Sequence, residues 1–155
     1  MLRTACSVSI VLLSLNAALA QPLDLGPLNN AYSGLVTFKV DKHQQLVLDL
    51  YDQGSRFRQD LVRPAYLDPE AITYSAEEDA IALKCLPSKA QCISKEIFKL
   101  DVVRATSRVT IPKPGDDPDG TRTIAQLREM ILQAQRSQDQ AGAETPNERA
   151  RKNAR

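Results

Sequence analysis

Alternating apolar and polar side chains dominate the first half of the chain and predict three consecutive strands. The first strand is expected over residues 32–41, where apolar side chains recur at every second position. The second is expected over residues 46–51 and the third over residues 56–62, with turn signals at 41–43 and 53–55 between them. Strands joined by such short turns form an antiparallel meander, and the alternation predicts one apolar and one polar face.

The apolar face of this meander is the candidate binding surface. Its side chains are spaced two apart within each strand, so they share one side of the sheet. On the third strand, Arg56, Arg58 and Asp60 are expected on the opposite, solvated face. Pairing with Asp49 and Asp60 would balance the two arginines there. The side chains that we expect to bind a ligand are Val36, Phe38, Leu46, Leu48, Leu50, Phe57 and Leu61.

Shorter segments with strand character follow in the second half of the chain. Between residues 95 and 105 the apolar spacing also fits a helix, so both assignments stay open there. With the meander, these segments predict a curved antiparallel sheet of six to eight strands. The strand candidates are residues 72–74, 80–85, 92–98, 100–103 and 108–111.

One amphipathic helix is expected near the C-terminus, over residues 123–138. Residues 112–120 before it are rich in proline and glycine, which excludes regular structure. Thr123 and Gln126 have the spacing of a capping box, and apolar side chains then recur at helical intervals. The fold class predicted from these patterns is α+β, with the helix packed on the sheet.

The first twenty residues have the order of a secretory signal peptide. Arg3 precedes an apolar run over residues 8–15, and the small residues Ala18 and Ala20 precede a cleavage site. The run is too short for ~30 Å of hydrocarbon, which requires about 20 apolar residues. We therefore expect residues 1–20 to be removed during export to the periplasm or the exterior, leaving no transmembrane segment in the mature protein.

The mature chain is expected to hold one β-rich domain over residues 21–138. Its first ten residues, 21–30, include two prolines and a glycine and are expected to form an extended leader. Residues 139–155 contain no Val, Ile, Leu, Met or aromatic side chain. Because such a segment has little apolar surface to bury, we expect a disordered polar tail.

Two cysteines remain after cleavage, Cys85 and Cys92, at the end of one strand candidate and the start of the next. In an oxidising compartment this pair is expected to form a disulfide that staples a hairpin. A redox dithiol usually has C-x-x-C spacing instead. A metal site would need more ligands than these two cysteines and the distant His43.

Charge and composition exclude several function classes. The chain has 20 basic and 19 acidic side chains, which gives no long-range attraction to nucleic acid. Its single histidine, His43, excludes most His-dependent mechanisms, and no nucleophile elbow, phosphate loop or zinc-protease motif occurs. Residues 115–120 resemble part of a calcium loop, but Gly115 and Gln126 stand where strong ligands are needed. We expect no catalytic residue, no metal and no cofactor.

The segments Tyr32-Ser-Gly-Leu-Val-Thr-Phe38 and Leu48-Asp-Leu-Tyr-Asp-Gln-Gly-Ser-Arg-Phe-Arg58 resemble a group of periplasmic proteins. These are the open-barrel carriers of the outer-membrane lipoprotein carrier type. In that group a strand that opens on Ser-Gly leads to a hairpin ending in Gly-x-(Lys/Arg)-aromatic-Arg. The resemblance implies a curved sheet whose apolar concave face holds an acyl chain under helices.

Two functional hypotheses follow. The first is a non-enzymatic exported binding protein that holds a lipid or an apolar peptide on the concave sheet face. The same apolar side chains are equally consistent with a filled core closed by the helix. The second hypothesis is a protein-interaction module, such as an inhibitor or an envelope-stress regulator, that acts on a protein partner without a small ligand. The sequence carries no signal for an oligomeric state.

Overall fold

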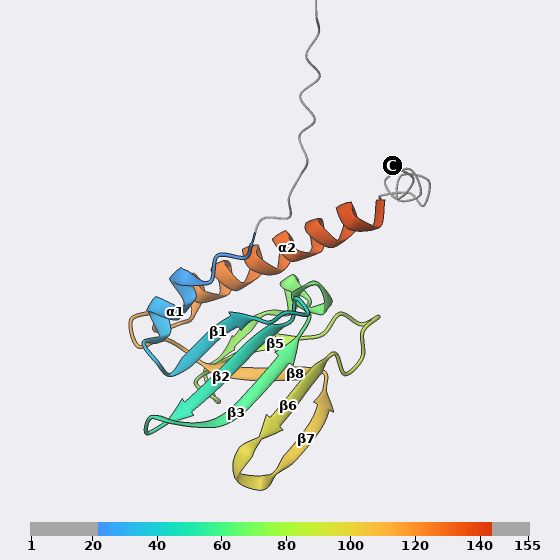
Figure 1. Ribbon diagram of the computed structural model, residues 1–155. Coiled ribbons are helices and arrows are strands. Elements are labelled where there is room, and N and C mark those ends of the chain that lie inside the picture. The colour runs from blue at the N-terminus through green and yellow to red at the C-terminus, as the bar shows by residue number, and fades with distance from the viewer. Residues whose placement is uncertain (1–21, 144–155) are drawn as a thin grey trace, which may run out of the picture.

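The computed structural model describes residues 22–143 and has an α+β fold with eight strands in two antiparallel sheets. The larger sheet has the order β1-β2-β3-β6-β7 and the smaller one the order β4-β5-β8. Figure 1 shows the long helix α2 (Thr121–Ala143) crossing one end of the molecule, with the smaller sheet behind the larger one. The predicted fold class is confirmed, and the strands are divided between two sheets.

The first three strands form the predicted meander. A turn after β1 is closed by Asp41, whose Oδ1 atom accepts hydrogen bonds of 2.8 Å from the N–H groups of His43 and Gln45. Such a side-chain acceptor fixes a tight turn and thereby the register of both strands. The strands of the larger sheet are β1 (Val36–Val40), β2 (Leu46–Asp52), β3 (Ser55–Val62), β6 (Ile93–Ile97) and β7 (Val102–Thr106).

The smaller sheet follows β3 after two short 3-10 turns. Between residues 95 and 105, where the sequence left helix and strand open, the chain completes β6, makes a 3-10 turn and enters β7. The strands of the smaller sheet are β4 (Thr73–Ser75), β5 (Ala80–Lys84) and β8 (Arg108–Pro112). The 3-10 turns are η1 (Pro64–Tyr66), η2 (Pro69–Ala71) and η3 (Phe98–Leu100).

A bulge between β2 and β3 changes the predicted alternation of β3. Leu50 of β2 pairs with Arg58, whereas the next residue, Tyr51, pairs with Arg56. Phe57 is therefore left without a cross-strand partner in β2. An extra residue in one strand moves every following side chain to the other face of the sheet.

The prediction for three β3 side chains is consequently wrong. Arg58 and Asp60 were expected on the solvated face, but Asp60 pairs in register with the core residue Leu48 and lies on the inner face with Arg58. Leu61 was expected on the apolar face, but it pairs in register with Val47 and lies on the outer face. The inner face of the larger sheet therefore contains an ion pair among its apolar side chains.

The predicted extended leader is also wrong in its second half, because residues 26–32 form helix α1 (Gly26–Tyr32). Pro27 stands in the first turn, where its missing N–H has no cost, and the Asp24 carboxylate accepts the N–H of Gly26 at 3.0 Å. Leu28 and Tyr32 lie one turn apart and are both buried. Tyr32 thus ends a helix, and the first strand begins four residues later than predicted.

Helix α2 is longer than predicted at both ends. It begins at Thr121, and it continues through residues 139–143, which the sequence assigned to the polar tail. The remainder of the predicted tail, residues 144–155, and the predicted signal peptide, residues 1–20, lie outside the described residues. No helix within the described part of the chain is long and apolar enough to cross a membrane.

The free backbone N–H groups in the first turn of α2 donate to Asp117, rather than to the predicted capping box of Thr123 and Gln126. The Oδ2 atom of Asp117 accepts the backbone N–H of Thr123 at 2.8 Å and the Thr123 hydroxyl at 2.7 Å. Its Oδ1 atom accepts the N–H of Arg122, and the Asp119 carboxylate accepts that of Thr121. The aspartates of the Gly- and Asp-rich loop therefore neutralise a helix N-terminus.

One apolar core joins both sheets and both helices. Leu127, Met130 and Ile131 on the lower side of α2 pack into it, and Leu28 and Tyr32 contribute from α1. Two further inward residues, Ile81 of β5 and Ile111 of β8, are completely buried. The helix therefore packs on the sheet as the sequence predicted, and of the two interpretations left open for the apolar face, the structure shows the filled core.

The predicted disulfide between Cys85 and Cys92 is present, with a Cα–Cα distance of 5.8 Å. It closes the connection between β5 and β6, which belong to different sheets. The N–H of Cys85 also donates to the carbonyl of Ser107 beside β8. The bond therefore holds together the place where the chain passes from the smaller sheet back to the larger one.

Replacement of both cysteines by serine is expected to lower the free energy of unfolding by about 2.5 kcal/mol, because the unfolded chain regains the entropy that a short closed loop had removed. Urea unfolding followed by circular dichroism measures this loss. The unsubstituted protein in a thiol reductant is the matched control and should lose a similar amount. Equal free energies of unfolding for the oxidised protein and the double variant would show that the disulfide does not stabilise the fold.

Candidate functional site

Five of the seven side chains predicted to bind a ligand form part of the filled core. They come from β1 and β2, and none is more than 3% exposed. Leu127 and Ile131 of α2 belong to the same buried cluster, so the helix covers the face that the sequence offered as a binding surface. These five buried residues are Val36, Phe38, Leu46, Leu48 and Leu50.

The two remaining predicted residues lie elsewhere. Phe57 stands at the bulge, is 39% exposed and borders an opening between the two sheets. Leu61 lies on the outer face of the larger sheet. The structure therefore does not assemble the predicted seven residues into one site.

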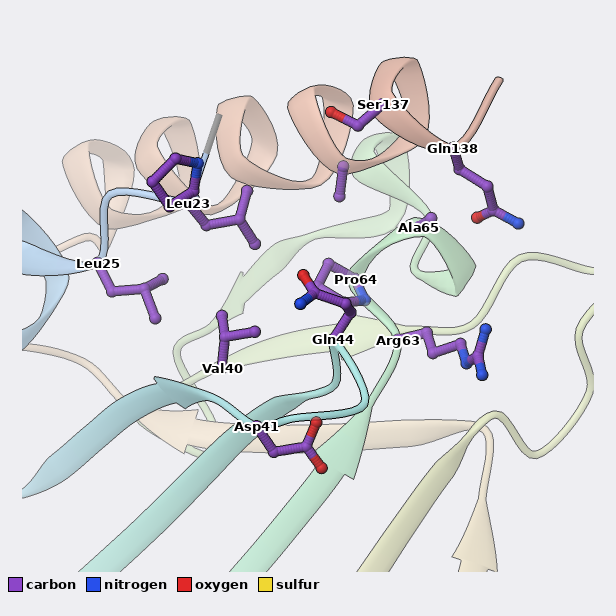
Figure 2. Close-up of a pocket in the computed structure, with 12 residues that line it drawn as sticks. Leu23, Leu25, Val40, Asp41, Gln44, Arg63, Pro64, Ala65, Ser137 and Gln138 are labelled. Atoms are coloured by element: carbon purple, nitrogen blue, oxygen red, sulfur yellow. The ribbon is translucent and has the colours of Figure 1, made fainter. Parts of the chain in front are cut away.

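A separate apolar groove lies beside the core, and we call it the helix groove (Figure 2). It has a volume of about 720 Å³ and is bounded by four parts of the chain: the C-terminal half of α2, the segment before α1, the turn after β1, and η1. The side chains that line it are Pro22, Leu23, Leu25, Val40, Asp41, Gln44, Arg63, Pro64, Ala65, Ala134, Ser137 and Gln138.

The sequence of α2 explains why the space is open. The apolar stripe of the helix passes from Leu127 through Ile131 and continues with the smaller Ala134 and the polar Gln138. No large apolar side chain follows on this side to fill the gap above the sheet. Figure 2 shows Leu23, Leu25 and Val40 turned into the space beneath the helix. The helix therefore closes the core at one end and covers a groove at the other.

Gln135 holds this end of α2 in place. Its Nε2 atom donates to the carbonyl oxygens of Leu67 at 3.0 Å and of Ala65 at 3.4 Å, both in or next to η1. These bonds join the helix to the opposite wall of the groove. Protein–protein hydrogen bonds of Gln135 therefore help to set the distance between α2 and η1 across the groove.

Polar side chains surround the mouth of the groove. Hydrogen bonds from the backbone N–H groups of Gln45 and His43 lower the pKa of Asp41, so its carboxylate stays ionised. The Arg63 guanidinium lies 5.8 Å from the centre of the Tyr66 ring, and it makes no ion pair with any carboxylate in the range 22–143. The mouth thus offers one unpaired cation beside the amides of Gln44 and Gln138.

A second opening, of about 770 Å³, lies between the two sheets, and we call it the sheet opening. Three exposed apolar side chains surround it: Leu35 at 50%, Phe57 at 39% and Leu100 at 60% exposure. Two of its acidic side chains are paired: Glu78 binds Arg108, and Asp79 lies 3.6 Å from Lys113. The sheet opening is therefore similar in volume to the helix groove and carries exposed apolar groups on its rim.

Arg56 and Arg58, which the sequence placed together, lie on opposite faces of β3. On the outer face, the Asp49 carboxylate binds Lys39 at 2.5 Å, Gln59 at 2.6 Å and Arg56 at 3.1 Å. Burial raises the pKa of Asp49, but these three donors outweigh burial and hold it below its ordinary value. The buried Asp49 carboxylate on the outer face therefore has donors for both of its oxygen atoms within the protein.

The helix groove was not predicted from the sequence. Its lining comes from four separate segments, and the only local signal is Leu23 and Leu25 alternating in a polar, proline-containing leader. Within residues 22–143 no group of three or more His, Cys, Asp or Glu side chains could hold a metal ion. No family model, no curated protein and no solved structure matches the chain.

Proposed function

We propose that this chain is a non-enzymatic exported binding protein that holds the apolar chain of an amphipathic ligand in the helix groove. The observation that carries the proposal is an apolar groove of about 720 Å³ with polar groups at its mouth. Binding sites for small molecules typically have this size and this composition. The disulfide supports export, because such bonds persist mainly in oxidising compartments.

The proposed ligand is a fatty acid or a lipid acyl chain. Each CH2 group removed from water contributes about 0.8 kcal/mol, so ten buried groups contribute about 8 kcal/mol before the entropy cost of binding. A micromolar or weaker affinity is therefore expected. The carboxylate or phosphate of such a ligand would remain at the mouth, where Arg63 has no carboxylate partner among residues 22–143.

The binding surface in this proposal differs from the one predicted from the sequence. The inner face of β1 and β2 serves as packed floor, and the ligand lies beside it under the second half of α2. A relation to the lipoprotein-carrier group is also a proposal. In that group the concave sheet face holds the acyl chain, whereas the corresponding face of this chain is a filled core.

Val40→Asp is expected to weaken the binding of a fluorescent fatty-acid probe at least tenfold, because a carboxylate would have to be desolvated against the apolar chain. Val40 lies at the end of β1 and is 37% exposed, so the folded state should tolerate the change. Val103→Asp is the matched control: it makes the same change at a 65% exposed valine outside the groove. Fluorescence titration measures both variants.

Native mass spectrometry of the purified protein provides an independent readout. An adduct of acyl-chain mass that disappears on delipidation supports the proposal. A clean apo mass combined with no probe binding by the unsubstituted protein rejects it. Equal probe affinity of the Val40→Asp and Val103→Asp variants would place the ligand outside the helix groove.

A protein-interaction role is the second candidate, and the sheet opening favours it. Leu35, Phe57 and Leu100 expose apolar surface around one opening, which is typical of a surface that another protein covers. A chain that binds no acyl probe and carries no adduct would favour this candidate over the first.

A further inference from the structure

The free edges of the two sheets differ in how they are covered. On β1, the side chain of Asn29 accepts the N–H of Phe38 at 2.7 Å and donates to its carbonyl at 3.0 Å, as a neighbouring strand would. On β8, the Arg58 guanidinium donates to the carbonyl of Thr110. The edge strand β4 is only three residues long and lies against α2.

β7 is the edge that lacks such cover. It is the outer strand of a hairpin that projects from the larger sheet (Figure 1). In the described chain, residues 102–105 have no hydrogen-bond partner other than β6. Alternate residues of an edge strand direct N–H and C=O groups away from the sheet, so β7 presents a row of free backbone donors and acceptors.

The side chains of β7 add charge to this edge. Arg104 is exposed, pairs in register with Lys95 of β6, and forms no ion pair within residues 22–143. Burial lowers the pKa of Lys95, and the positive charges of Arg58, Arg104 and Arg108 lower it further, against the opposing effect of Asp60. The inner face of this hairpin therefore has more positive charge than its carboxylates neutralise.

We propose that β7 is a docking edge for an extended, acidic segment of a partner protein, which adds to the larger sheet as a sixth strand. Backbone hydrogen bonds to β7 would supply affinity, and alternate side chains of the partner would supply specificity. A carboxylate on the inner face would lie beside Arg104 and Lys95. An apolar side chain on the outer face would cover Val103, which is 65% exposed.

Charge argues against two other occupants. Antiparallel pairing of two copies of β7 would bring Arg104 of one chain toward Arg104 of the other, and like charges opposed across strands are destabilising. Residues 144–155 of the same chain contain four basic and two acidic side chains, so they have the wrong sign. The inference concerns a different surface from the helix groove and does not depend on the ligand proposed there.

The test uses a fluorescein-labelled eight-residue peptide in which Glu alternates with Val and Thr, and measures fluorescence anisotropy with the full chain. We expect saturable binding, at least tenfold weaker for the Arg104→Glu variant. The control Lys42→Glu makes the same charge change in the exposed turn after β1 and should alter affinity less than about twofold. Hydrogen exchange should show new protection of backbone amides in residues 102–106.

Two control peptides separate strand addition from simple charge attraction. A peptide with Lys in place of Glu should not bind, and a Glu peptide methylated on alternate backbone nitrogens should lose binding because it lacks the N–H donors that pair with β7. Binding by either peptide at the affinity of the parent overturns the proposal. Three other results would also overturn it: no binding of the parent peptide up to about 1 mM, an unchanged peptide affinity of the Arg104→Glu variant, or a dimer that forms through β7.

Discussion

Replacing Asp60 with alanine is expected to lower the free energy of unfolding by about 3 kcal/mol, although the residue has no role in the proposed ligand site. Asp60 is completely buried on the inner face of β3, and its Oδ2 atom binds the Arg58 guanidinium at 2.9 Å. Without the carboxylate, Arg58 would be a largely buried cation with no counter-charge. The loss is near the lower limit for a broken buried pair, because Arg58 still donates to the Thr110 carbonyl and borders the sheet opening.

The double variant Arg58→Leu/Asp60→Leu separates the cost of breaking the pair from the value of the pair. Replacing a buried ion pair by apolar residues is often neutral or stabilising. The Oδ1 atom of Asp60 has no hydrogen-bond partner in the described chain, which increases the cost of burying the carboxylate. We therefore expect the double variant to be more stable than Asp60→Ala in urea unfolding. A double variant that is less stable than the single one would contradict this account.

The pH dependence of stability provides a second check. Burial raises the pKa of Asp60 against the lowering effect of Arg58 and Lys95. The folded state therefore binds the Asp60 proton more tightly than the unfolded state, and the stability contributed by this proton is complete below the unfolded pKa and is lost as pH rises through the folded value. The cost of Asp60→Asn should consequently increase on acidification. Asp49, with a lowered pKa, should show the reverse, since its contribution is lost as pH falls.

The parts of the fold that were predictable are those determined by local pattern. Leu46, Leu48 and Leu50 alternate without interruption, and short turns on both sides leave one simple pairing, so β2 was assigned correctly. The stripe of α2 and the two cysteines carry similarly local signals. By contrast, α1 gives little local signal, because it is short and contains Gly26 and Pro27. Its Asn29 side chain makes two hydrogen bonds to the backbone of Phe38, a contact that exists only once β1 has formed.

The candidate site could not be predicted for the same reason. A groove is the space that side chains leave open, and the walls of the helix groove belong to segments from Leu23 to Gln138 that meet only in the folded chain. The sequence does indicate that Ala134 and Gln138 follow Ile131 on one side of α2. It does not indicate whether a neighbouring segment fills the space beneath them. Five of the seven predicted site residues lie in the core because alternation shows which side chains share a face, but not which part of the chain covers that face.

Because of the bulge in β3, two leucines to which the sequence gives the same role are expected to contribute differently to stability. Leu48→Ala is expected to lower the free energy of unfolding by about 3 kcal/mol, within the range of about 2–5 kcal/mol for a leucine removed from a packed core. Leu48 is completely buried between β1 and β3, where it pairs with Phe38 and Asp60. Asp60 is held by its ion pair with Arg58, and the backbone of Phe38 by hydrogen bonds to Asn29, so we expect little collapse into the cavity.

Leu61→Ala is the matched control, with an expected loss of about 1 kcal/mol or less because the side chain is partly exposed on the outer face. Without the bulge, both leucines would face the core and both substitutions would cost about the same. Urea unfolding of the two variants, analysed with one m-value for both, gives the difference between the two losses of free energy. That difference reports on the register of β3. A cost for Leu61→Ala equal to that for Leu48→Ala would show that β3 keeps simple alternation and that Arg58 and Asp60 face solvent.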